Sequence, residues 1–197
     1  QYVPYDQLPK NFVNSLIAAE DHQYFQHHGI DLPGFARAMY ANIRAGRIVQ
    51  GGSTITQQTA KNLFERKGRS VKAKLTELLF ALRLEYHYSK EKIFEFYVNQ
   101  FYVSGNGRGL GVAARYYFDK EPEQLDLVEA AFIAGSVKRP NYYNPFIKKD
   151  EAGAAKARHN AKVRTAYVLG QLYRLGMISV EEYQQALNRE IPFNRGK

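Results

Sequence analysis

The 197-residue sequence contains no cysteine, no tryptophan and no long run of apolar residues. Without cysteine, neither a disulfide nor a thiolate metal site can form, although this absence says little about the cellular compartment. No stretch reaches the roughly 20 apolar residues that a membrane-spanning helix needs. No signal peptide is visible, and the abrupt start at Gln1 is typical of a fragment whose upstream part has been removed.

Strand signals are also missing, because apolar and polar residues do not alternate and Asn106-Gly107 lies in a glycine-rich loop instead of between two apolar runs. Apolar residues recur instead at spacings of three and four, with capping residues at the starts of these runs. We therefore predict a mainly α fold and a single domain over residues 1–197. The predicted helices cover about residues 9–20, 31–46, 53–64, 70–87, 89–98, 125–136 and 151–175, and a last one opens at the Ser179/Glu182 capping box.

The charge balance is strongly basic, with 28 Lys and Arg against 19 Asp and Glu, for a formal net charge of +9. Such a balance favours an anionic partner, which leaves nucleic acid, a phosphate-bearing substrate and an anionic membrane as alternatives.

The first candidate site is the acidic pair Glu20-Asp21, which ends an apolar helical stripe and precedes aromatic residues and histidines. A carboxylate against apolar walls holds a proton more tightly, which suits a general base. A solvated helix end is the plainer interpretation, and this segment alone favours it. His22, His27 and His28 lack the i, i+4 spacing of a zinc-binding helix, so we expect no metal site here.

The second candidate covers residues 50–58, where every residue except Ile55 is polar or glycine. Paired glycines let the backbone approach a ligand closely, and the hydroxyls and amides supply many donors. The helix start behind them could hold an anion. The plainer interpretation is a glycine turn before a helix capped by Ser53 or Thr54. The residue order does not match a nucleotide-binding P-loop.

The third candidate is a basic series that ends in one acid. Lys74 and Glu77 are three residues apart and therefore share a helix face. A cationic face beside a polar loop can stabilise a diphosphate leaving group, whereas a solvated salt-bridge face is the plainer interpretation. The series consists of Lys61, Arg66, Lys67, Arg69, Lys72, Lys74 and Glu77.

Five motifs, in order along nearly the whole chain, resemble those of the peptidoglycan glycosyltransferase family. This family comprises the transglycosylase domains of class A penicillin-binding proteins and their monofunctional relatives. Residues 51–58 match the second motif in full, whereas Tyr24, which replaces the usual Phe, and Val98 and Leu110 are departures. The matched positions are Glu20, Asp21, Tyr24, His27 and Gly29, residues 51–58, Lys74 and Glu77, residues 97–118, and residues 129–145.

The resemblance implies a two-lobed, mainly α-helical domain with a lysozyme-like larger lobe and a smaller membrane-facing jaw. It also implies that lipid II, a disaccharide-pentapeptide on undecaprenyl diphosphate, is polymerised into the β-1,4-linked glycan strands of peptidoglycan. The C4 hydroxyl of a glucosamine attacks C1 of the muramyl sugar that ends the growing chain. The anomeric carbon inverts, and undecaprenyl diphosphate leaves.

The same resemblance implies roles for individual residues. Glu20 corresponds to the general base that deprotonates the attacking hydroxyl, and Glu77 to the second catalytic carboxylate, which supports the diphosphate site or positions its cations. Lys61 and Arg69 match diphosphate-binding positions. The residues implied to bind substrate are Asp21, Ser53, Thr54, Gln57, Lys61, Arg69, Lys74 and Arg164, the last matched through the Val168-Leu169 pair that follows it.

The segment of about residues 31–49 is the predicted jaw. Its apolar residues Phe35, Met39, Tyr40, Ile43, Ile48 and Val49 are interspersed with Arg37, Arg44 and Arg47. This pattern is typical of an interfacial helix, and a core-facing helix fits its periodicity equally well. On the first interpretation, the apolar side chains face solvent in the isolated domain and dock on a bilayer.

The implied partners are lipid II, the growing glycan chain and the membrane surface, with no nucleic acid. A transpeptidase domain or partner is compatible with the resemblance. The implied location is the outer face of the cytoplasmic membrane, with an N-terminal anchor outside this sequence. No cofactor is evident. Some family members use Mg²⁺ or Mn²⁺, but the sequence shows no dedicated ligand cluster for either ion.

Two other functions stay open at this point. A lytic, lysozyme-like glycosidase would cleave the same glycan with a glutamic acid and water, but it would not need the basic series after residue 60. A non-enzymatic basic module that binds nucleic acid would fit the charge, but it would leave the polar segment 51–58 unexplained.

Overall fold

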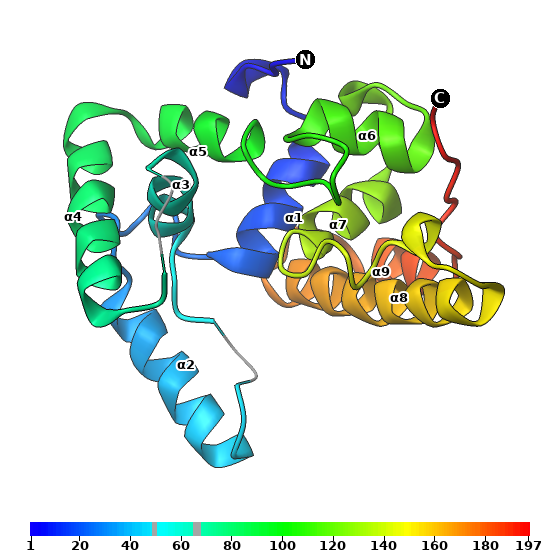
Figure 1. Ribbon diagram of the computed structural model, residues 1–197. Coiled ribbons are helices and arrows are strands. Elements are labelled where there is room, and N and C mark those ends of the chain that lie inside the picture. The colour runs from blue at the N-terminus through cyan, green and yellow to red at the C-terminus, as the bar shows by residue number, and fades with distance from the viewer. Residues whose placement is uncertain (49–50, 65–67) are drawn as a thin grey trace. The chain divides into compact units, whose positions relative to one another are not determined.

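The computed structural model describes residues 1–48, 51–64 and 68–197. Within these ranges the chain forms nine α-helices, three short 3-10 helices and no β-strand, which confirms the predicted mainly α class (Figure 1). The α-helices are α1 (Lys10–Glu20), α2 (Leu32–Ala45), α3 (Ile55–Leu63), α4 (Val71–His87), α5 (Lys90–Val98), α6 (Leu110–Phe118), α7 (Leu127–Ser136), α8 (Glu151–Arg174) and α9 (Val180–Leu187). The 3-10 helices cover Tyr5–Gln7, Pro122–Gln124 and Pro145–Ile147.

Local capping explains why most predicted helices begin where they do. The side chains of Asp31, Ser70 and Ser89 each accept a hydrogen bond from a backbone N–H in the first turn of α2, α4 and α5. Ser179 and Glu182 form the predicted capping box of α9. These contacts join residues three apart, so the sequence alone is enough to predict them.

One helix was not predicted. Helix α6 follows a glycine-rich turn, and its N-cap Gly109 has no side chain and a φ of +94°. A helix without a capping side chain gives no start signal in the sequence. Its first residue is already buried, so tertiary packing holds this helix in place.

The chain divides into two compact units. Unit 1 comprises Gln1–Ala19 and Phe101–Lys197, and unit 2 comprises Glu20–Gln100. The prediction of a single domain over residues 1–197 stays a prediction. Glu20, the last residue of α1, is the first residue of unit 2.

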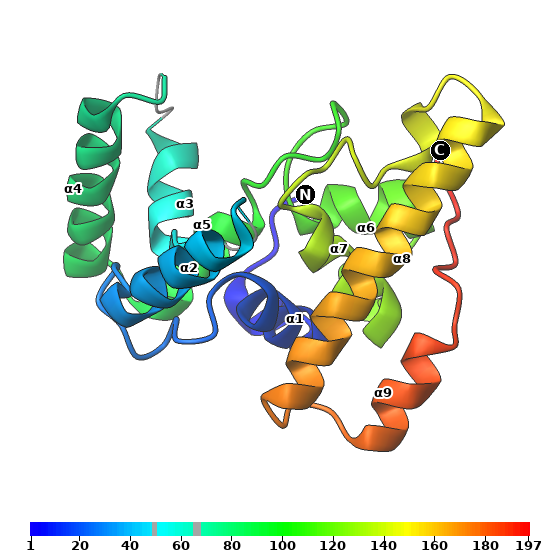
Figure 2. The same cartoon turned by 90° about the horizontal axis from the view of Figure 1, so that it is seen from below.

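Unit 1 is built around α7 and α8, which pack against each other, and α9 lies along α8 (Figure 2). Every residue of α7 after Leu127 is buried. The core of this region joins four helices through Ala18, Val128, Ala131, Val168, Leu169, Leu172 and Ala186. A second cluster consists of aromatic rings, in which Phe132 contacts Tyr117, Phe118 and Phe193.

Unit 2 is centred on α3, which packs against both α4 and α5 (Figure 1). Helix α2 buries only Ala38, so the interpretation of residues 31–49 as a core-facing helix is wrong for the described part of that segment. In α4, the apolar residues Leu75, Leu79 and Leu82 are exposed, whereas the opposite face buries Ala81 and Leu84. The spacing therefore predicted a helix, but not which face of it is covered.

Candidate active site

Glu20 lies half-buried at the carboxyl end of α1, and its carboxylate faces the amide of Gln58 on α3. Gln58 Nε2 donates to Glu20 Oε2 over 3.4 Å. The other end of the same amide, Gln58 Oε1, accepts from the Tyr97 hydroxyl at 2.9 Å. Burial raises the pKa of the Tyr97 phenol well above its usual value of 10.0, and the nearby Glu20 carboxylate raises it further. Tyr97 therefore stays a neutral hydrogen-bond donor beside Glu20.

Asp21, the other half of the acidic pair, is buried and is bound inside the protein. Its Oδ2 accepts from the backbone N–H of Ile55 at 2.9 Å and from His27 Nε2 at 2.7 Å. Ile55 is the first residue of α3, so the carboxylate also lies at the positive end of that helix. Asp21 thus ties the end of the first motif to the start of the second.

The contacts of His27 determine its tautomer. Its Nδ1 accepts from the backbone N–H of Gly29 at 3.0 Å and from the Lys90 ammonium at 3.3 Å. Because Nδ1 serves as an acceptor, the ring proton is on Nε2, which donates to Asp21. Lys90 also pairs with Glu85 at 2.5 Å. These groups form a partly buried polar network that the sequence did not predict, because its two halves, residues 21–29 and 85–90, are far apart along the chain.

The polar segment before α3 is held by its own side chains. Thr54 and Gln57 form a capping box, in which Gln57 Oε1 accepts from the Thr54 N–H at 2.7 Å and Thr54 Oγ1 accepts from the Gln57 N–H at 3.1 Å. Thr54 Oγ1 also donates to the carbonyl oxygen of Gly29 at 2.6 Å. Of the two caps considered from the sequence, Thr54 is the one that the structure shows. Both side chains are buried.

Lys74 joins the second motif to the third. Its ammonium donates to Ser53 Oγ at 3.0 Å and to Glu77 Oε1 at 2.6 Å. The side chain of Glu77 is 2% exposed, whereas that of Lys74 is 40% exposed. This pair is therefore not a solvated surface salt bridge, because its acidic half lies in the interior.

The remaining predicted cations lie at two different places. Lys61 is exposed in the last turn of α3, and Arg69 is exposed just before α4 begins. Arg66 and Lys67 lie outside the described residues. Arg164 belongs to unit 1, where its Nε donates to the carbonyl of Gly135 at 3.1 Å and its guanidinium lies over the ring of Tyr167.

Nine of the ten predicted site residues thus belong to unit 2, and Arg164 is the exception. Two further residues lie beside Glu20 without having been predicted: Gln58 contacts its carboxylate, and Tyr97 contacts Gln58. Gln58 and Tyr97 both lie within the matched motifs, and this location was the only feature of the sequence that could have indicated a role for them. In the described part of the chain, no three acidic or histidine side chains gather in a way that could hold a metal ion.

The transglycosylase family is matched over residues 1–172. The chain belongs to this family. The match confirms both the family and the enzyme class predicted from the sequence. Among similar proteins, penicillin-binding protein 1A of Aquifex aeolicus is 40% identical over 190 residues, covering 96% of this chain and 25% of the relative. Penicillin-binding protein 1A of Neisseria flavescens is 39% identical over 195 residues, covering 99% and 23%.

A solved structure resembles this transglycosylase in fold. The crystal structure of penicillin-binding protein 1A from Haemophilus influenzae aligns with a TM-score of 0.57 and 20% identity, covering 100% of this chain and 18% of that one. This similarity shows that the helical fold is shared. The chain spans about a quarter of the length of the curated relatives it matches.

Proposed function

We propose that this transglycosylase polymerises lipid II into β-1,4-linked glycan strands, with inversion at the anomeric carbon and release of undecaprenyl diphosphate. One observation carries the proposal: Glu20 stands half-buried beside the polar start of α3, in the same unit as the pair Lys74–Glu77. An ionised carboxylate in that position can accept the proton of the attacking C4 hydroxyl. Cations in the same unit can balance the charge that develops on the leaving diphosphate.

The contacts divide the predicted site residues by role. We assign substrate contact to Ser53, Lys61, Arg69 and Lys74. Lys61 and Arg69 are exposed, the Lys74 side chain is 40% exposed, and Ser53 accepts a hydrogen bond from Lys74. Glu77 holds the Lys74 ammonium beside Ser53 and so positions the cation. Arg164, on α8, stays a proposed substrate contact.

Asp21, Thr54 and Gln57 are proposed to act on the substrate through the backbone that they hold. Their side chains are buried and bonded within unit 2. Removing any of them would loosen the first turn of α3, which carries the polar groups of the second motif.

Replacement of Glu20 tests the proposal directly. Glu20→Gln keeps the size of the side chain and removes the base, so polymerisation of lipid II should fall by at least ~100-fold while the melting temperature stays close to that of the parent. Glu181→Gln, an exposed carboxylate change on α9, is the matched control and should retain the parent rate. A Glu20→Gln variant that still polymerises lipid II at the control rate would refute the assignment of the base. Release of fragments from finished peptidoglycan by the parent protein would support the lytic glycosidase instead.

Replacement of the exposed cations tests the proposed diphosphate contacts. Lys61→Ala and Arg69→Ala should each lower the rate with lipid II by roughly tenfold or more. The stability should hardly change, because an exposed charge contributes about 0 to 1 kcal/mol. Lys156→Ala, an exposed change on α8, is the control for loss of one charge. Equal rates for all three variants would place Lys61 and Arg69 on a solvated face that does not contact the substrate.

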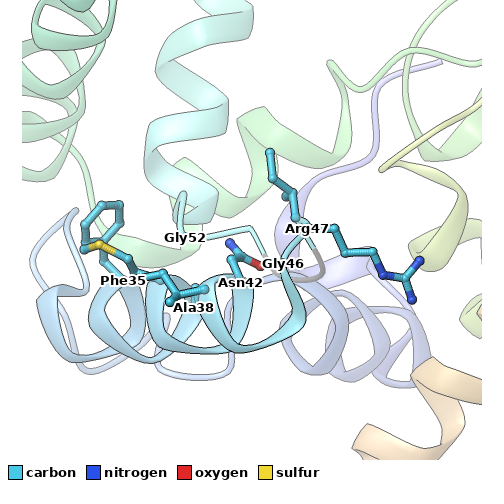
Figure 3. Close-up of a pocket in the computed structure, with 9 residues that line it drawn as sticks. Phe35, Ala38, Asn42, Gly46, Arg47 and Gly52 are labelled. Atoms are coloured by element: carbon cyan, nitrogen blue, oxygen red, sulfur yellow. The ribbon is translucent and has the colours of Figure 1, made fainter.

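We also propose that α2 and the residues after it dock on an anionic membrane surface, as the jaw at about residues 31–49 implies. Exposed apolar side chains support this, among them Phe35, Ile43 and Ile48, whereas Val49 lies outside the described residues. A groove of about 480 Å³ lies along this helix and reaches Gly52 at the polar segment (Figure 3). None of the helices in the described part of the chain is both long and apolar enough to cross a bilayer.

Hydrogen exchange measures this docking. Backbone amides of α2 should exchange fast in solution and more slowly with vesicles that contain anionic lipid, whereas α8 should not change. Equal exchange of α2 with and without vesicles would contradict membrane docking and leave the role of Glu20 intact. We propose that the enzyme works at the outer face of the cytoplasmic membrane, as the family resemblance implies. We propose that an N-terminal anchor and a transpeptidase domain or partner serve it there.

A further inference from the structure

The amide of Gln58 can face Glu20 in two ways, and only one of them suits a general base. An ionised carboxylate has acceptors only, so it requires the NH₂ end of the amide. The structure places that end, Nε2, toward Glu20 and the carbonyl end, Oε1, toward Tyr97. With the amide turned round, two oxygens would face each other, and the ionised base would be disfavoured.

Tyr97 selects between these two orientations. Its hydroxyl lies 2.9 Å from Gln58 Oε1, which is shorter and therefore stronger than the 3.4 Å contact between Gln58 and Glu20. Tyr97 is 1% exposed and lies near the end of α5, which packs against α3. The phenol ring therefore has little room to move. A phenol that stays protonated in this setting donates a hydrogen bond to Oε1 at any pH at which the enzyme works.

We infer that Tyr97 is a positioning residue for the glycosyl transfer: by donating to Gln58 Oε1, it aims the Gln58 amide N–H at Glu20 and favours the ionised form of that base. The inference rests on the proposed function, because it takes Glu20 to be the base. The proton route is unchanged: the attacking hydroxyl gives its proton to Glu20, and neither Tyr97 nor Gln58 gains or loses one.

Tyr97→Phe removes the hydroxyl and leaves the ring in place. We expect kcat with lipid II to fall on the order of tenfold, with KM within about twofold of the parent, because the substrate still binds. The acid limb of the pH–rate profile should move to higher pH by about half a unit, since Glu20 loses a contact that favours its ionised form. Tyr117→Phe is the matched control: Tyr117 is a buried tyrosine of unit 1, and its loss should move neither quantity.

Gln58→Leu supplies the second measurement, because it removes the amide and leaves an apolar side chain that is one bond shorter. It should reproduce the shift of the acid limb. Adding Tyr97→Phe to Gln58→Leu should cause no further loss, because Tyr97 acts through Gln58. If Tyr97→Phe does not fold, as judged by its melting transition, the acid limb of Gln58→Leu alone decides the inference.

Three results would overturn the inference: an unmoved acid limb in a folded Tyr97→Phe or in Gln58→Leu, a rise in KM with kcat unchanged, or additive losses in the double variant. Glu20→Gln separates this failure from a failure of the proposed function. An inactive Glu20→Gln beside an unaffected Tyr97→Phe removes only the role of Tyr97. An active Glu20→Gln removes Glu20 as the base, and this inference with it, whereas a parent protein that does not polymerise lipid II removes the proposed function itself.

Discussion

The two units of this transglycosylase differ in how much of their helix surfaces is buried. In unit 1, α7 is buried along its length between α8 and a cluster of aromatic rings. In unit 2, α2 buries one alanine, and α4 leaves an apolar stripe in solvent. Unit 2 also buries Asp21, Thr54, Gln57 and Glu77 in hydrogen bonds and ion pairs, and these four residues lie in the first three motifs.

Because of this difference, we expect substitutions in the two units to have different effects on stability and activity. Unit 1 derives its stability from apolar area removed from water. In unit 2, the polar groups that hold the first and second motifs together lie next in sequence to Glu20 and Ser53, which we place in the reaction site. Substitutions in unit 1 should therefore register mainly as changes in stability, whereas those around α3 should change stability and activity together.

Phe132→Ala should have the largest effect on stability. The ring is 1% exposed, and its centroid lies 4.9 Å from those of both Tyr117 and Phe193. Truncation should lower the free energy of unfolding by about 3–5 kcal/mol, because a cavity remains. The control, Phe35→Ala on α2, removes a ring that is 51% exposed and should change stability by about 0.5 kcal/mol or less. Denaturant unfolding measures both, and similar losses would show that the two units are packed alike.

Gly29→Ala should have an intermediate effect. Gly29 has a φ of +97°, and an added Cβ would lie 3.0 Å from Glu85 Cγ. The Gly29 carbonyl also accepts a hydrogen bond from the Thr54 hydroxyl, so a shift of the backbone at Gly29 would displace the start of α3. We expect a loss of about 1–3 kcal/mol, together with lower activity. Gly170→Ala on α8 is the control, since its φ is not positive and its added Cβ would make only an ordinary contact, 3.6 Å from the Tyr183 hydroxyl. A stable, fully active Gly29→Ala would show that unit 2 tolerates movement at this junction.

Asp126→Asn should have the smallest effect, and one that depends on pH. Burial alone would raise the pKa of Asp126, but the Glu129 N–H and the Arg189 guanidinium outweigh it and hold the pKa below 3.8. A lowered pKa in the folded state contributes stability that is present above pH 3.8 and is lost as the pH falls through the folded pKa. Asn still caps α7, so the loss at pH 7 should be about 0.5–1 kcal/mol.

Thermal melting at pH 7 and at pH 3 measures this effect. The difference between the parent and Asp126→Asn should shrink at the lower pH. A difference of the same size at both values would mean that the charge of Asp126 does not stabilise unit 1.

Much of the fold could be predicted from the sequence because its signals are local. A cap such as Ser70 or Ser89 acts on the backbone three residues ahead, and an apolar spacing of three or four marks a helix wherever that helix packs. The family could be predicted as well, because its motifs are short stretches of particular residues that follow one another in a fixed order along the chain. Helix α6 was missed because Gly109 offers no capping side chain, and the exposure of the α4 stripe was missed because spacing does not say what covers a face.

The sequence by itself determined the helical class, most helix starts, the family and the identity of the acidic pair as a candidate site. Only the tertiary structure decided how that pair divides: Asp21 is bound to Ile55 and His27, and Glu20 faces Gln58. It also brought Tyr97 to the far end of the same amide, 39 positions along the chain from Gln58. The physical reason is that hydrogen bonds and burial depend on distance in space. Two adjacent carboxylates are chemically equivalent in the sequence, and only the folded chain gives each of them different neighbours.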